Sequence, residues 1–237
     1  INSANIACGF HAGDANIMAE TLKSCKDNKT SAGAHPGYPD RENFGRTKMD
    51  LTPEEVYNIT LYQLGALGAI ADAKGVKLEH VKPHGAMYNA AAKDRALADA
   101  IAAAVADYDK SLIFLALSGS EMINAAKSIG LRYASEVFAD RAYEADGTLR
   151  ARGLDGAMIT DENEAVERVI RMAKHGKVKA FTGEDIDIEA HSVCVHGDGP
   201  KAIGFVKKLN DAFRDNDIET VSLSEVIDSC FSERRPR

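Results

Sequence analysis

The chain has 237 residues, of which 45% are hydrophobic and 27% charged, and its 36 acidic and 29 basic residues give a formal net charge of −7. This composition is typical of a globular protein and excludes a disordered, collagen-like or coiled-coil chain. The negative charge argues against nucleic acid or an anionic membrane as the partner, so we expect a small-molecule ligand.

Short apolar runs, separated by polar or glycine-rich breaks and amphipathic stretches, recur along the whole chain. Such runs are typical of buried parallel strands. About seven strands are expected, at residues 4–8, 31–34, 80–82, 112–117, 133–138, 178–181 and 192–195, with a weaker one at 218–221.

Helix start signals lie between these runs. The sequence predicts capping boxes at Thr52–Glu55 and Ser118–Glu121, a helix opened by Asp161, and a fourth helix with an apolar stripe from Ala202 to Phe213. Helices that alternate with short strands indicate βαβ units and a parallel sheet. We therefore expect an α/β protein with one domain over residues 1–237, a closed or nearly closed (β/α) barrel rather than an open sheet, and a frayed tail at residues 232–237.

The ends of the chain and its cysteines bear on its location. No apolar run is long enough for a membrane span, and the first residues lack the features of a secretory signal. The four cysteines form no close CxxC pair, and a chain of this size does not depend on disulfides. We expect a cytoplasmic protein. Because the chain opens without Met and inside an apolar run, we also expect a further N-terminal segment before Ile1.

Four of the seven histidines, His11, His35, His84 and His196, lie close to the ends of expected strands. The carboxyl ends of the strands of a barrel meet at one face, so we expect these side chains to share a pocket. Imidazoles are suited to acid–base catalysis near neutral pH and to metal binding. A carboxylate such as Asp14 would orient them or join them as a ligand.

Some of these residues also have a purely structural interpretation. Asp14 precedes an amphipathic stretch and is equally suited to be the N-cap of a helix. His80 lies away from the strand exits, so we expect a solvated or capping role for it. Cys8 and Cys194 fit small buried core side chains better than nucleophiles.

Two further features near the strand exits suggest charge recognition. Lys82 ends a buried strand, where a lysine needs a partner or a catalytic role. The run from Gly197 to Lys201 precedes a helix and can form an anion cradle, because its glycines let the backbone approach a ligand. Walker A, GxSxG and HExxH motifs are absent from the sequence, which argues against a P-loop, a serine hydrolase and a metzincin.

Long motifs near the strand exits are shared with a known family. They lie at residues 3–14, 33–36, 39–46, 81–85 with Tyr88 and Asn89, 137–141 and 194–199. With these motifs the chain resembles the LamB/YcsF family from its start to about Val221. The resemblance implies an irregular TIM-like barrel related to the sugar deacetylases. Family members begin with a short acidic strand that lies outside this sequence, so we expect the site residues within the sequence to form an incomplete set.

The resemblance also implies an activity. The family is the A subunit of the bacterial ATP-dependent 5-oxoprolinase, which opens 5-oxo-L-proline to L-glutamate while ATP is hydrolysed to ADP and phosphate. We expect this protein to be active only with two partner subunits, B and C. ATP is the expected cofactor, accompanied by a divalent cation such as Mg²⁺, and neither nucleic acid nor a membrane is expected as a partner.

The candidate site residues fall into two groups under this resemblance. The group expected to be catalytic is His11, Asp14, His35, His84 and Lys82, and its three histidines are also candidate metal ligands. The group expected to bind substrate or nucleotide is Arg46, Asn89, Arg141, His196, Gly197, Asp198 and Gly199.

Two other functions stay open at this point. A metal-dependent hydrolase of amidated sugars would hold a divalent ion tightly and act without ATP. A non-catalytic subunit would only bind ligand, so that changes at His11 or His84 would weaken binding but leave turnover at saturating ligand.

Overall fold

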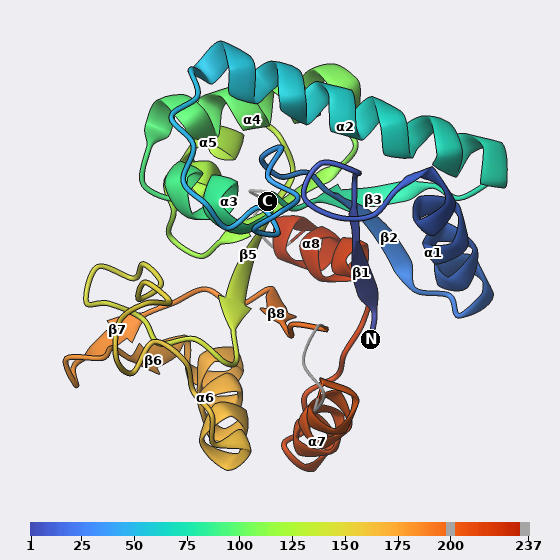
Figure 1. Cartoon of the computed structure of the whole chain (residues 1–237). Helices are drawn as coiled ribbons and strands as arrows, with labels where there is room; N and C mark the ends of the chain where they lie inside the picture. Colours follow the sequence, from blue (N-terminus) through green and yellow to red (C-terminus); the bar gives the residue numbers. More distant parts are fainter. Residues whose placement is uncertain (198–201, 233–237) are drawn as a thin grey trace. The chain divides into compact units, whose positions relative to one another are not determined.

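The computed structural model describes residues 1–197 and 202–232 (Figure 1). The chain divides into two compact units. Unit 1 comprises Ile1–Ala116, Ser120–Ala134 and the chain from Ser222 onward, and unit 2 comprises Leu117–Gly119 and Ser135–Val221. The predicted site residues Asp198 and Gly199, and the predicted frayed tail beyond residue 232, lie outside the described residues.

Parallel strands alternate with helices along the chain, which confirms the predicted α/β class. The six-stranded sheet has the order β1 (Ser3–Ala7), β2 (Ser31–His35), β3 (Leu78–Val81), β4 (Ile113–Leu117), β5 (Tyr133–Phe138) and β8 (Ser192–Cys194). The pairs β1–β2, β2–β3, β3–β4 and β5–β8 are parallel. The boundary between the units falls within β4 and β5.

Helices cover the strands of unit 1. They are α1 (Ala15–Asp27), α2 (Pro53–Lys74), α3 (Gly85–Ala91), α4 (Arg95–Tyr108), α5 (Glu121–Ser128) and α8 (Leu223–Ser232). Helices α1, α2, α4 and α5 pack side by side in this order, which follows the order of the strands (Figure 1). None of the helices within residues 1–197 and 202–232 has the length and apolar character that a membrane crossing requires.

The strand register gives the sheet of unit 1 one apolar and one partly polar face. Side chains alternate between the faces of a strand. Ile6, Ala34, Val81 and Phe114 therefore form one fully buried apolar row. On the opposite face, Asn5, Gly33, His80 and Ile113 are aligned across β1 to β4. His35 and Lys82 lie two residues further along this second face, so the fold places them at the carboxyl ends of β2 and β3.

Helix α8 covers the β4 end of this second face. Leu223 and Ile227 of α8 form a buried cluster with Ile113 and Leu115 of β4 and with Ala134. The apolar part of the face is thus closed by a helix, and the polar part lies on β1 to β3.

His80 corrects one expectation, because it is fully buried rather than solvated or capping. Its Nε2 donates a hydrogen bond to Asn5 Oδ1 at 2.9 Å. A Cβ at Gly33 would lie 2.1 Å from His80 Nε2, so the ring occupies the space that this glycine leaves. Burial, reinforced by the charge of Lys82, lowers the pKa of His80 to about 4. The ring is therefore neutral at physiological pH.

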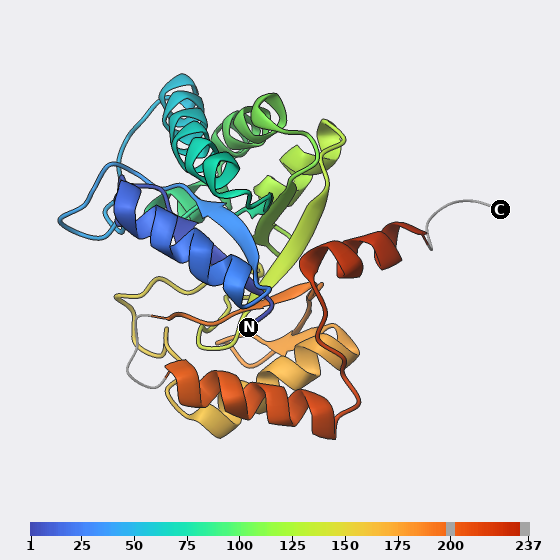
Figure 2. The same ribbon diagram turned by 90° about the vertical axis from the view of Figure 1, so that its right-hand side faces the viewer.

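Unit 2 holds the end of β5 beside β8, together with α6 (Glu162–His175) and α7 (Ala202–Asp215), which pack against each other (Figure 2). It also holds a two-stranded antiparallel ribbon of β6 (Lys177–Lys179) and β7 (Asp185–Asp187). The predicted parallel strand at residues 178–181 is therefore wrong. A short turn with Gly183 at φ +100° joins the two strands, and parallel strands need a longer crossover. The weaker strand predicted at residues 218–221 is also wrong, since this segment is a loop.

The helix caps agree with the sequence signals, with one exception. Thr52 and Glu55 form a reciprocal capping box at α2, and Asp161 caps α6 through the backbone N–H groups of residues 163 and 164. The predicted box of Ser118 is wrong. Helix α5 begins at Glu121, and Ser118 Oγ accepts a hydrogen bond from Glu189 N at 2.9 Å. A partner distant in sequence therefore overrides the local capping pattern.

Candidate active site

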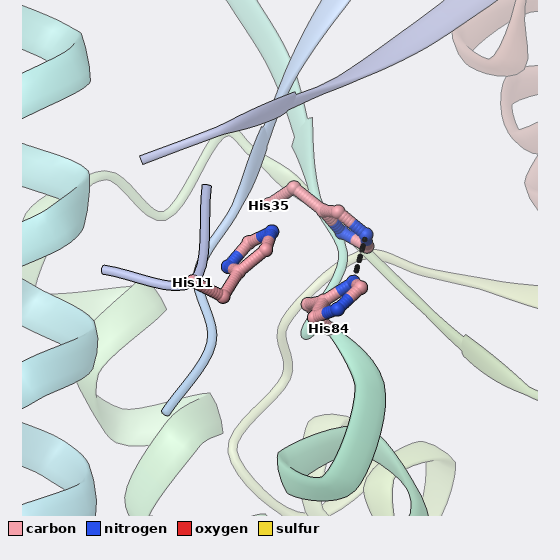
Figure 3. A group of neighbouring side chains, drawn as sticks. All are labelled: His11, His35 and His84. Carbon is pink, nitrogen blue, oxygen red and sulfur yellow. Dashed lines mark hydrogen bonds between the residues drawn. The ribbon is translucent and has the colours of Figure 1, made fainter. Parts of the chain in front are cut away.

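Three of the predicted histidines meet in unit 1 (Figure 3). His11 lies in the loop after β1, His35 is the last residue of β2, and His84 is the N-cap residue of α3. The rings of His11 and His84 are stacked with centroids 3.9 Å apart. The ring of His35 stands edge-on to both, 5.6 Å from His11 and 4.8 Å from His84. One ring nitrogen of each residue lies within 4.8 Å of those of the other two.

Backbone carbonyls fix where His35 and His84 carry their protons. His35 Nδ1 lies 2.6 Å from the carbonyl oxygen of Lys82, and His84 Nε2 lies 2.7 Å from that of Phe44. A carbonyl oxygen only accepts, so both of these ring nitrogens donate. In neutral rings the remaining nitrogens, His35 Nε2 and His84 Nδ1, carry lone pairs. These two atoms face each other at 3.0 Å (Figure 3).

The facing lone pairs require a positive species between the two rings. Two acceptors at hydrogen-bond distance repel each other unless a proton or a cation lies between them. Burial lowers the pKa of His35 well below its usual value, and the charge of Lys82 lowers it further. The protonated ring is thus disfavoured, and a cation that accepts both lone pairs is favoured.

His11 adds a third neutral imidazole. Its side chain is buried, and burial together with the charges of His84 and Arg41 lowers its pKa to about 3. Its Nδ1 has no hydrogen-bond partner among the described residues, so no contact of that atom fixes the tautomer. Imidazole nitrogens are ligands for zinc and other divalent transition metals, and a three-histidine set leaves positions open for water or substrate. The donor set therefore fits such an ion.

The loop between β2 and α2 lies directly against the stacked rings. A Cβ at Gly37 would lie 2.7 Å from His11 Nδ1, and one at Gly45 would lie 2.7 Å from His11 Cβ and 2.9 Å from His84 Cδ2. Gly45 also has a φ of +66°, which favours glycine. The loop backbone thus takes the place that side chains would otherwise fill.

Phe44 supplies both an aromatic edge and a hydrogen-bond acceptor to the site. Its ring stands nearly perpendicular to those of His11 and His84, with centroids 5.6 and 5.2 Å away. Its φ is +56°, a conformation that costs a non-glycine residue about 1 kcal/mol or more. This strained backbone directs the Phe44 carbonyl at His84 Nε2 and so fixes the His84 tautomer.

Two side chains hold the loops that carry the histidines. Gln63 of α2 accepts a hydrogen bond from Gly37 N and donates one to Gly37 O, both at 2.9 Å. Arg41 donates to the carbonyl oxygens of Gly9 and Gly13, on either side of His11. The β1 and β2 loops are therefore linked to each other and to α2.

The other predicted catalytic residues differ in their surroundings. Lys82 is buried, and its Nζ lies 5.7 Å from the centroid of the Tyr88 ring. Asp14 is exposed and accepts hydrogen bonds from Asn16 N and Ile17 N at 2.8 and 2.9 Å. The structure thus bears out the capping interpretation of Asp14, and its catalytic role stays a prediction.

The residues predicted to bind substrate or nucleotide lie in both units. In unit 1, Arg46 is exposed with its guanidinium 5.1 Å from the Phe44 ring, and Asn89 is exposed on α3. In unit 2, Arg141 is buried, and His196 and Gly197 follow β8. Three of the four strand-exit histidines thus meet in unit 1, and the fourth belongs to unit 2.

Comparison with known proteins places the chain in a family. The family model described as "LamB/YcsF family" matches residues 1–228. The chain belongs to the LamB/YcsF family. It is 54% identical over 226 residues to the A subunit of 5-oxoprolinase from Clostridium beijerinckii, and the match covers 95% of this chain and 89% of that protein. It is 50% identical over 227 residues to the A subunit of 5-oxoprolinase from Pyrococcus abyssi, with 96% and 89% coverage.

A solved structure of a similar protein agrees with the fold. The crystal structure of a lactam utilization protein from Thermus thermophilus superposes with a TM-score of 0.87 at 41% identity, and the match covers 94% of this chain and 89% of that chain. The resemblance to the LamB/YcsF family inferred from the motifs is confirmed, and the predicted function agrees with these relatives, which are A subunits of 5-oxoprolinase.

Sequence reasoning on this LamB/YcsF chain missed Phe44 and Gln63. Gln63 carried a usable signal, because it lies beside Thr60 and Leu64 on the buried face of α2, and a buried amide needs hydrogen-bond partners. Phe44 lies within the motif at residues 39–46, but the motif does not reveal its role, which depends on a left-handed backbone conformation next to Gly45.

Proposed function

We propose that this chain is the A subunit of an ATP-hydrolysing 5-oxoprolinase, which opens 5-oxo-L-proline to L-glutamate together with two further subunits. The observation that carries the proposal is the 54% identity to such an A subunit over 95% of this chain. The three facing histidines support it, because a lactam needs both a polarised carbonyl and an activated water to be opened.

The proposed reaction uses ATP because a lactam is a poor electrophile. Transfer of the terminal phosphoryl group to the amide oxygen would make the ring carbon open to attack by water. The ring C–N bond would then break with a proton passing to nitrogen, and a second water would release phosphate from the acyl phosphate. One water thus adds to the ring carbon, and the other cleaves the acyl phosphate to the carboxylate and phosphate.

We assign the polar side chains of unit 1 to the lactam. A divalent ion held by His11, His35 and His84 would supply Lewis acidity for the carbonyl or for water. Lys82, buried at the carboxyl end of β3, would stabilise negative charge that develops on oxygen. Arg46 would contact an anionic group of the substrate or nucleotide at the exposed end of the loop. In unit 2, Arg141 and His196 are the residues that we assign to an anionic group of substrate or nucleotide.

Glutamate formation from 5-oxoproline tests the proposal. The purified chain would be assayed alone and with its two partner subunits, each with and without ATP. We expect glutamate only when all three subunits and ATP are present. Absence of glutamate from the complete mixture would contradict the proposal.

The three-histidine cluster also favours a second candidate, a metal-dependent amide hydrolase that needs no ATP. This candidate predicts release of acetate from an acetylated sugar by the metal-loaded chain alone. The same preparations can be used, so a single set of assays separates the two functions.

A further inference from the structure

We propose that unit 2 binds an oxyanion, a phosphoryl or carboxylate group, through Arg152, His196 and Arg141. The site lies at the carboxyl ends of β5 and β8, where Phe138 pairs with Cys194. Arg152 belongs to neither group of site residues predicted from the sequence.

The hydrogen bonds of His196 set up the site. His196 Nδ1 lies 2.8 Å from Asp140 Oδ2, and its Nε2 lies 3.1 Å from Arg152 Nη2. A guanidinium only donates, so Nε2 carries the lone pair and Nδ1 donates to the carboxylate. Asp140 thus fixes the tautomer. Burial raises the pKa of Asp140, but the hydrogen bond from His196 and the charge of Arg152 outweigh it and hold the pKa below its usual value.

Arg152 is poised to exchange one partner for another. It is exposed, and it donates to a neutral imidazole nitrogen and, at 3.6 Å, to Met158 Sδ. Both acceptors are weak for a guanidinium, whose planar fork matches an oxyanion. Among the described residues, no carboxylate lies within ion-pair distance of Arg152. An anion would therefore be a better acceptor for this side chain than its present contacts.

Arg141 adds a second unneutralised charge. Its side chain is 3% exposed, its Nη2 donates to Arg150 O at 2.5 Å, and its buried Nε has no partner in the described part of the chain. Burial lowers the pKa of Arg141, and the neighbouring charge of Arg152 lowers it further. Two guanidinium groups that raise each other's energy are stabilised together by an anion. Within the described part of the chain, Asp140 is the carboxylate in contact with this cluster, against these two cations.

Arg171, in the same unit, differs from Arg152 because it has a carboxylate partner. Its Nη1 and Nη2 donate to the two carboxylate oxygens of Asp185 at 2.8 and 2.6 Å. This arginine already has a bidentate carboxylate partner, so it is a matched control for Arg152.

Binding would be accompanied by a change at His196. When Arg152 turns to the anion, His196 Nε2 takes up a proton from solvent and donates to the same anion, while Nδ1 stays on Asp140. Among the described residues, the groups in contact with His196 are Asp140, Arg152 and the Phe138 ring. The ring would then carry two donors.

The test is a calorimetric titration of the full chain with inorganic phosphate, acetate, ATP and 5-oxoproline. Wild type is expected to bind phosphate with an observed enthalpy that differs between buffers of different ionisation enthalpy, because a proton is taken up on binding. Arg152→Gln is expected to weaken binding by about tenfold or more, Arg152→Lys by less, and Arg171→Gln not at all. Thermal unfolding of each variant checks that the fold is retained. His196→Gln should remove the proton uptake.

The competing ligands distinguish the source of the oxyanion, and only this assignment rests on the proposed function. Competition of ATP with phosphate would identify a nucleotide phosphoryl group, and competition of 5-oxoproline or acetate would identify a carboxylate. Wild type that binds none of these anions, or Arg152→Gln and His196→Gln that bind them as wild type does, would overturn the proposal. Because the titration needs neither turnover nor the other two proteins of the complex, its failure is distinct from a failure of the glutamate assay.

Discussion

The two units each gather imidazole at the ends of parallel strands, but the surroundings of the imidazoles are opposite. In unit 1, backbone carbonyls accept hydrogen bonds from the ring N–H groups of His35 and His84, so that the lone pairs of the other two ring nitrogens face each other. In unit 2, a carboxylate accepts a hydrogen bond from the ring N–H of His196, and a guanidinium donates one to the other ring nitrogen. The first arrangement favours a cation and the second an anion.

The difference shows that a histidine at a strand exit does not by itself define its chemistry. A backbone carbonyl orients the ring but brings no net charge, whereas Asp140 brings a negative charge that can support an imidazolium. The two histidine sites also differ in what their free nitrogens face, because those of His35 and His84 face each other and that of His196 faces a guanidinium. The following changes test this contrast.

His84→Ala is expected to have the largest effect. It removes one of the two facing lone pairs and the stacking partner of His11. We expect loss of divalent metal from the protein after dialysis and a fall in glutamate formation of about 100-fold or more. Metal content measured by mass spectrometry, and turnover of the three-subunit mixture, check the two expectations.

The control for this change is His175→Ala, which removes an exposed histidine at the end of α6. It should leave metal content and turnover unchanged. Phosphate binding should survive in both variants, because the anion contacts lie in unit 2. His84→Ala protein that keeps its metal, or that loses phosphate binding, would remove the contrast between the units.

Much of the framework could be predicted from the sequence. The apolar runs that became β1 to β5 are bounded by Gly, Pro and helix caps, and His11, His35 and His84 lie at or shortly after the ends of β1, β2 and β3. The segment at residues 178–181 shows the limit, because a short apolar run does not reveal the direction of its partner strand. There the close return of the chain at Gly183 produces an antiparallel ribbon.

The geometry of the three-histidine cluster, His11, His35 and His84, could not be predicted in the same way. The tautomers of His35 and His84 depend on the carbonyls of Lys82 and Phe44, which lie 47 and 40 residues away from them in the chain. Only the folded backbone brings these groups together. Arg152 was missed for a similar reason, since its contact with His196 spans 44 residues.

His80→Gln separates burial from site chemistry in unit 1. Its pKa is about 4 in the folded chain and near 6.5 when unfolded, so the unfolded state binds the proton more readily. The stability that neutral His80 provides is therefore complete above about pH 6.5 and is lost as the pH falls toward 4, by on the order of 3 kcal/mol. Chemical unfolding of wild type and His80→Gln from pH 7.5 to 5 should show that the difference in their free energies of unfolding shrinks, because only wild type loses stability through this histidine. A constant difference would show that His80 does not titrate.

Asp14 gives the smallest effect and decides between its two interpretations. Because the carboxylate accepts from Asn16 N and Ile17 N, Asp14→Ala should cost about 1 kcal/mol of unfolding free energy, whereas Asp14→Asn keeps the cap and should cost little. We expect Asp14→Asn to retain turnover within about twofold, since its capping oxygen holds the start of α1 and the loop that carries His11. Loss of turnover in Asp14→Asn at unchanged stability would instead assign the carboxylate charge to the chemistry of the three-histidine cluster. Unit 1 would then pair its cation site with an acid, as unit 2 pairs His196 with Asp140.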